Sequence, residues 1–187
     1  MADSVITLAR YFFLLLLVLP STALAHQLDE YIHATLVSIE PGEIRIQVNL
    51  TPGVQVASNV LALIDLDHDG VISTNEAAGY AKTFQHDLVV QLDKHRAQLK
   101  LVASRFPAMS ELRTGWGIIQ LEFSISAAPV SAGAHKLVFE DRHLPAISAY
   151  LFNAAKPKSN LIQIVGQKRN QTQSLGEVAF NFTPAKP

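Results

Sequence analysis

The chain contains no cysteine, which excludes disulfide bonds, lipid anchoring through a cysteine and a cysteine nucleophile. Methionine is scarce as well, with Met1 and Met109 alone, and there is a single tryptophan, Trp116. The net charge is −1, and no basic patch interleaved with aromatic residues is present, so nucleic acid is not an expected partner. After residue 25 no apolar run approaches the roughly 20 residues of a membrane helix, so no membrane span is expected there.

The N-terminus has the pattern of a secretory signal peptide. An apolar run over residues 11–19 follows Arg10 and leads to the small-residue sequence Ala23-Leu24-Ala25. The run is too short to cross a hydrocarbon core of roughly 30 Å. We therefore expect cleavage after Ala25, which divides the chain into a signal peptide (1–25) and one exported domain (26–187). Without disulfides, this domain suits a bacterial periplasm better than a eukaryotic secretory route, so we predict a periplasmic or secreted protein.

Strand patterns dominate the exported domain. Apolar and polar residues alternate strictly from Ile119 to Ile125 and again from Ile44 to Leu50, as in half-buried strands. Short strands at this spacing, separated by polar turns, favour an antiparallel β-sandwich. Only residues 52–86 change to a helical period, with Thr51 as the expected helix cap. The predicted fold is mainly β (α+β): an antiparallel β-sandwich with a helix-loop-helix insertion at about 52–86.

Twelve residues within this insertion carry the clearest chemical signal. From Asp65 to Glu76 they have carboxylates at positions 1, 3, 5 and 12 and glycine at position 6. This is the calcium-loop spacing D-x-[DN]-x-[DN]-G-x5-E, which brings several hard oxygen donors to one point. The predicted ligands are the side chains of Asp65, Asp67 and Asp69, the carbonyl oxygen of Val71, Ser73 directly or through water, and both carboxylate oxygens of Glu76.

With its helical flanks, the loop resembles the EF-hand family. The resemblance covers residues 52–86 and implies Ca²⁺ as the bound ion. Ser73 and Glu76 also fit a helix capping box, S-x-x-E, but a capping box explains neither the aspartates nor Gly70. EF-hands that act as sensors come in pairs and expose a methionine-rich groove. This chain has one loop and no methionine in it, so we expect a structural ion.

A looser resemblance concerns the order of segments. A signal peptide runs into the sequence of residues 26–31 and is followed by two strands, a helix and the acidic loop. This order resembles the periplasmic segment that precedes the membrane domain in bacterial permease-like proteins of the hydrogenase and urease nickel-accessory type. The resemblance implies an accessory module in the periplasm whose partner is an unknown protein or membrane protein.

Two further sites remain as alternatives. Cleavage would make His26 the first residue, and its α-amino group and imidazole together suit copper or nickel, unless this end is merely a frayed terminus. The dense ionisable sequence from Glu140 to His143 fits either a hydrolase site or a polar turn with local ion pairs. A pocket that holds this cluster beside Trp116 would favour the hydrolase, whereas an exposed turn would exclude it. No G-x-S-x-G motif is present, and no enzyme activity is expected.

Overall fold

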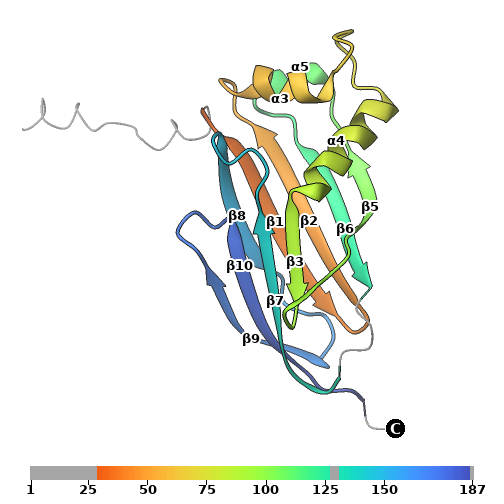
Figure 1. Ribbon diagram of the computed structural model, residues 1–187, viewed down its shortest axis with the longest axis vertical. Coiled ribbons are helices and arrows are strands. Elements are labelled where there is room, and N and C mark those ends of the chain that lie inside the picture. The colour runs from red at the N-terminus through yellow and green to blue at the C-terminus, as the bar shows by residue number, and fades with distance from the viewer. Residues whose placement is uncertain (1–28, 127–130, 186–187) are drawn as a thin grey trace, which may run out of the picture.

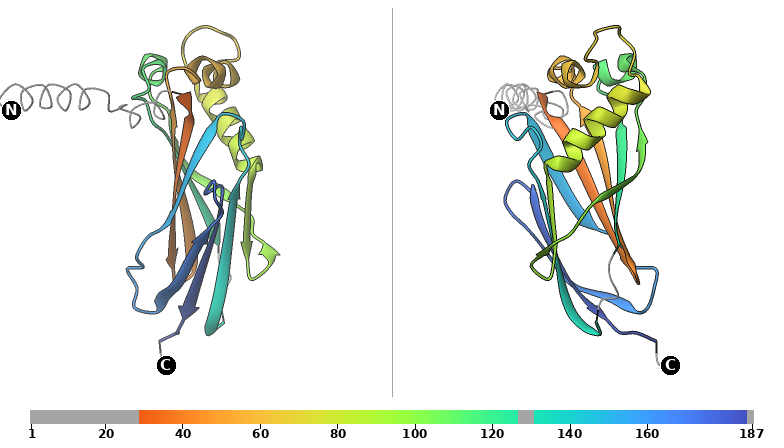
Figure 2. Two further views of the ribbon diagram at one scale, coloured as in Figure 1. Left: turned by 90° about the vertical axis from the view of Figure 1, so that its left-hand side faces the viewer. Right: turned by 45° about the vertical axis from the view of Figure 1, so that its right-hand side comes forward.

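The computed structural model describes residues 29–126 and 131–185, and within them two five-stranded sheets face each other as two layers (Figures 1 and 2). The first sheet has the order β5-β6-β2-β1-β8 and consists of β5 (Lys100–Arg105), β6 (Ile119–Ser126), β2 (Glu43–Pro52), β1 (Tyr31–Glu40) and β8 (Ser148–Ala154). The second has the order β4-β3-β7-β10-β9 and consists of β4 (His95–Arg96), β3 (Leu88–Leu92), β7 (Gly133–Asp141), β10 (Leu175–Phe182) and β9 (Ile162–Arg169). The mainly β fold predicted from the sequence is thus confirmed.

The core lies between the two sheets and follows the alternation of the strands. In β2 the side chains that face inward are at most 1 % exposed, while the polar residues between them face outward. β7 and β10 supply the opposing wall with Phe139 and Phe180, and Phe139 stacks on Phe152 of β8 with ring centroids 5.5 Å apart. Burial of such side chains contributes about 1.5–3 kcal/mol each, so this alternation is what holds the two layers together.

One strand pairing departs from the antiparallel prediction. β1 runs parallel to β8, with Tyr31 opposite Ser148 and His33 opposite Tyr150, whereas its other neighbour β2 is antiparallel. The first sheet is therefore mixed. Periodicity predicts that a segment is a strand but carries no information about which distant strand it joins, so the sequence could not show this pairing.

The helices gather at the end of the sandwich where β1 begins (Figure 1). They are α3 (Ala57–Ile64), α4 (Thr74–His86) and the short α5 (Met109–Arg113). Of these, α5 was not predicted from the sequence. Thr51 and Pro52 belong to β2 and do not begin the first helix, so this part of the prediction was wrong; Val56 is the N-cap of α3. Both long helices bury one face against the core, and no helix of the described residues is long and apolar enough to cross a membrane.

Candidate metal centre and a buried histidine network

The acidic loop connects α3 to α4, as the motif predicts. Asp65 caps the C-terminal end of α3 and is only 4 % exposed, and α4 begins at Thr74 after a capping box formed by Ser73 and Glu76. Gly70 has φ +84°, a backbone conformation that glycine adopts without steric cost and that turns the chain sharply. The loop therefore folds its first and last carboxylates toward each other.

Three of the predicted ligands converge. Asp65, Asp67 and Glu76 each place a carboxylate oxygen within 4.8 Å of the other two. Asp65 Oδ2 accepts a hydrogen bond from the Gly70 N–H at 3.2 Å, but its buried Oδ1 has no hydrogen-bond partner. An unpartnered buried polar atom costs about 1–3 kcal/mol, and carboxylates so close together repel each other. A bound cation would remove both costs at once.

Glu76 is held in an ionised form by the loop backbone. Its Oε2 accepts hydrogen bonds from the Ser73 N–H at 2.9 Å and from the Ser73 hydroxyl at 2.8 Å, and its Oε1 accepts one from the Leu66 N–H at 2.8 Å. These hydrogen bonds, first among them the one from the Ser73 N–H, hold the pKa of Glu76 below its usual value. The capping-box interpretation of this pair is therefore correct for the helix end and is compatible with ion binding.

Two of the other predicted ligands, Asp69 and Ser73, form hydrogen bonds within the loop. Asp69 Oδ1 accepts a hydrogen bond from the Val71 N–H at 2.8 Å, and Ser73 donates its hydroxyl hydrogen to Glu76. The convergent set therefore contains three of the six predicted residues, all hard oxygen donors of the kind that Ca²⁺ and Mg²⁺ prefer.

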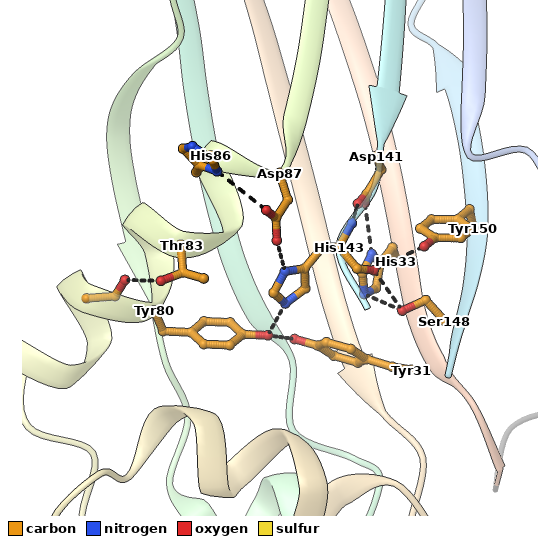
Figure 3. A network of polar contacts seen from close by, with 11 residues as sticks. Tyr31, His33, Tyr80, Thr83, His86, Asp87, Asp141, His143, Ser148 and Tyr150 are labelled. Carbon is orange, nitrogen blue, oxygen red and sulfur yellow. Dashed lines mark hydrogen bonds and ion pairs between the residues drawn. The ribbon is translucent and has the colours of Figure 1, made fainter. Parts of the chain in front are cut away.

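A second polar cluster was predicted only in part, because two of its members, Asp141 and His143, belong to the ionisable sequence from Glu140 to His143. It lies in the core between α4, β1 and the connection from β7 to β8 (Figure 3). His33, which is fully buried, pairs through Nδ1 with Asp141 Oδ2 at 2.8 Å, and its Nε2 lies 3.3 Å from the Ser148 hydroxyl oxygen. For His33, the only trace in the sequence is its inward position in β1, two residues after Tyr31.

His143 forms the other half of this cluster. Its Nδ1 lies 2.7 Å from Asp87 Oδ2, and its Nε2 lies 3.1 Å from the Tyr80 hydroxyl, which in turn is 2.7 Å from the Tyr31 hydroxyl (Figure 3). The rings of His33 and His143 stack with centroids 5.9 Å apart. Each histidine is therefore oriented by its own carboxylate, and we call these residues together with Ser148 the histidine network.

Burial sets the protonation of the network. It lowers the pKa of His143, although the hydrogen bond to Asp87 opposes the shift, and it raises the pKa of Tyr31 and of Tyr80. The two tyrosines therefore keep their hydroxyl hydrogens at neutral pH. His143 favours the neutral imidazole, which accepts one hydrogen bond and donates another.

Stability is expected to fall as the pH drops below about 6.5. Because the folded-state pKa of His143 lies below the unfolded value, the unfolded chain binds more protons in this range. The contribution of His143 is fully present above pH 6.5 and declines by up to about 1.4 kcal/mol per pH unit down to the folded pKa. Urea unfolding of wild type and His143→Gln between pH 7.5 and 5 measures it. The difference between the two proteins should shrink on acidification, and a constant difference would contradict the prediction.

The sequence from Glu140 to His143 is divided between surface and core. Glu140 and Arg142 form an exposed ion pair at 2.6 Å, whereas Asp141 and His143 are at most 3 % exposed. The predicted polar turn is therefore correct for only half of these residues. Trp116 is 85 % exposed and lines another hollow with Val54 and Ile118, so it neither joins this cluster nor closes the core.

A surface hollow of about 650 Å³ adjoins the histidine network. Its walls come from the start of β1, the end of β7, the β7–β8 connection and β8, and from the turn before β10. They include Glu30, Glu140, Asp141, Arg142, Ser148 and Tyr150. Ser148 and Asp141 thus belong both to the hollow and to the network.

The signal peptide and His26 lie outside the described residues, so the copper or nickel alternative remains a prediction. Comparison with protein-family models, curated proteins and solved structures finds no match to this chain. Function is therefore argued from the two sites themselves.

Proposed function

We propose that the protein binds one calcium ion through residues 65–76 and that the ion fastens the helix pair to the sandwich. The buried, unpartnered oxygen of Asp65 carries the proposal, because it lies among the carboxylates of Asp67 and Glu76 within the spacing of a calcium loop. An acidic surface turn without an ion would turn this oxygen to water or to a backbone N–H.

A structural ion agrees with the packing of the two helices. Val60, Leu61 and Ile64 of α3 are at most 4 % exposed, and so are Tyr80 and Phe84 of α4. Opening the pair as a sensor does would expose these side chains at about 1.5–3 kcal/mol each. An ion that ties the end of α3 to the start of α4 instead keeps both helices on the core.

The wider role that we propose is that of an exported accessory protein, with a protein or membrane-protein partner in the periplasm. It rests on the sequence patterns at residues 11–25 and 26–31. In such compartments calcium modules bind with dissociation constants on the order of 10⁻⁴–10⁻³ M, so ambient calcium can keep the site filled.

Calorimetric titration of the purified protein with CaCl₂ tests the calcium site. We expect one ion per chain in wild type and at least tenfold weaker binding in Glu76→Gln, in which glutamine keeps the capping box but loses the carboxylate. Glu177→Gln changes a partly exposed glutamate in β10 that pairs with Lys136; it is the matched control and should bind as wild type does. The absence of both heat and a shift in Tm at millimolar calcium in wild type would refute the proposal.

A further inference from the structure

We propose that Ser148, His33 and Asp141 form a nucleophile, a general base and an orienting carboxylate for the hydrolysis of carboxylic esters in the adjoining hollow. This activity goes beyond calcium binding and does not depend on it. His33 lies more than a hundred residues before Asp141 and Ser148, and no G-x-S-x-G motif surrounds Ser148.

The parallel pairing of β1 with β8 brings the three residues together. Ser148 is the first residue of β8 and lies opposite Tyr31, two residues before His33, while Asp141 is the last residue of β7 (Figure 3). The Ser148 hydroxyl oxygen lies 3.3 Å from His33 Nε2, and His33 Nδ1 lies 2.8 Å from Asp141 Oδ2. The hydrogen-bonded chain thus runs from serine to histidine to carboxylate, as the activation of a serine nucleophile requires. The serine–histidine distance is longer than an ideal hydrogen bond, which is common before substrate binds.

The hydrogen bonds fix the direction of proton transfer. Asp141 accepts at Oδ1 from the His143 N–H at 2.9 Å, so its Oδ2 is left to accept from the Nδ1–H of His33. The Nε2 of His33 is then an acceptor, and Ser148 is the donor in reach. The Ser148 hydroxyl can also donate to the His143 carbonyl oxygen, at 3.2 Å. This oxygen accepts a second hydrogen bond from the Tyr150 hydroxyl at 3.0 Å, so it keeps a partner when Ser148 donates to His33 instead.

The nucleophile is accessible where its partners are not. Ser148 is partly exposed and lines the hollow; Asp141 also lines it but is only 3 % exposed, and His33 is fully buried. Three acidic side chains line the hollow, those of Glu30, Glu140 and Asp141, but the lining contains one basic side chain, Arg142. This excess of negative charge favours an uncharged or cationic ester over an anionic one. β8 is an edge strand, and the Tyr31 N–H bonds the Ile147 carbonyl, so the Ser148 N–H points away from β1 and offers a donor to an oxyanion.

The reaction needs no group besides water. Ser148 Oγ attacks the ester carbonyl carbon while its proton passes to His33 Nε2, and the carbonyl oxygen takes up the negative charge. The carbon–oxygen bond to the alcohol then breaks, and the leaving oxygen takes the proton from His33. Water attacks the acyl-serine with His33 again accepting a proton, which releases the carboxylic acid and restores the Ser148 hydroxyl.

The test is labelling of the purified protein with an uncharged fluorophosphonate, followed by intact and peptide mass spectrometry, together with hydrolysis of p-nitrophenyl acetate. We expect one adduct, on Ser148, formed at least tenfold faster than on any other serine. Ser148→Ala should abolish the adduct and enzymatic ester hydrolysis, while Ser110→Ala, an exposed serine of α5 that does not line the hollow, should retain both.

Asp141→Asn tests whether Ser148 is activated or merely exposed. Asparagine favours the wrong histidine tautomer, so labelling of the folded variant should slow at least tenfold. No preference for Ser148 in wild type, or full ester hydrolysis in Ser148→Ala, would overturn the proposal. Calcium titration of Ser148→Ala should match wild type in either case, which separates this result from that for the metal centre.

Discussion

Asp65→Asn is expected to raise the free energy of unfolding in calcium-free buffer by about 1 kcal/mol and to abolish stabilisation by calcium. Asparagine has nearly the shape of aspartate but no charge, so it ends the repulsion with Asp67 and Glu76 at a site that is 4 % exposed. Its amide can also donate to a neighbouring carboxylate. The same change removes a ligand charge from the proposed calcium site, so the two effects have opposite signs.

Thermal and urea unfolding with chelator and with 10 mM calcium measures both effects. Wild type should gain about 1–3 kcal/mol from calcium, or roughly 3–10 °C in Tm, whereas Asp65→Asn should gain almost nothing. Asp67→Asn is the matched control, because Asp67 is exposed; it should lose the calcium effect with little change in chelator. Destabilisation of Asp65→Asn in chelator would show that the buried carboxylate has a stabilising partner and would argue against an ion site.

Asp141→Ala is expected to destabilise the protein by about 2–6 kcal/mol, because it removes the buried acceptor of two hydrogen bonds and each donor left unpaired costs about 1–3 kcal/mol. Asp141 accepts hydrogen bonds from the His33 ring and from the His143 N–H, and both groups would be left without a partner in the core. The loss would approach half of the total stability of an ordinary domain.

Urea unfolding at pH 7.5 checks this value against Arg142→Ala at the next position. The Arg142 side chain is exposed and pairs with Glu140, so its removal should change the free energy of unfolding by less than about 0.5 kcal/mol. Equal, small effects of the two substitutions would mean that water reaches the histidine network and that the burial of Asp141 is less complete than its position implies.

The sequence predicted those features that depend on residues close to one another in the chain. Alternation within β2 and β6 is local, and it predicted both strands and the side chains that they bury. The acidic loop is also local, since its spacing alone brings Asp65, Asp67 and Glu76 together. The error at Thr51 and Pro52 arose because β2 continues to the residue at which a helix cap was expected, so strand pairing overrode the local signal.

The histidine network lay beyond such patterns. His33, Asp87 and Asp141 come from three strands or strand ends, and only the tertiary pairing places them in contact. Glu140 to His143 showed a cluster of charge, but not that alternate members face in opposite directions. Side chains face in alternate directions because these residues continue the end of β7, where one face of the strand packs on the core and the other is in contact with water.

The parallel pairing of β1 with β8 has a consequence for the order of folding. β1 and β2 can form a hairpin as soon as both have been made, but the other edge of β1 stays open until Ser148 and the residues after it arrive. Closing this contact requires a loop of more than a hundred residues, which slows folding and leaves an unpaired strand edge able to bind other chains. A chain that stops short of β8 would retain the acidic loop while its first strand remains open to aggregation.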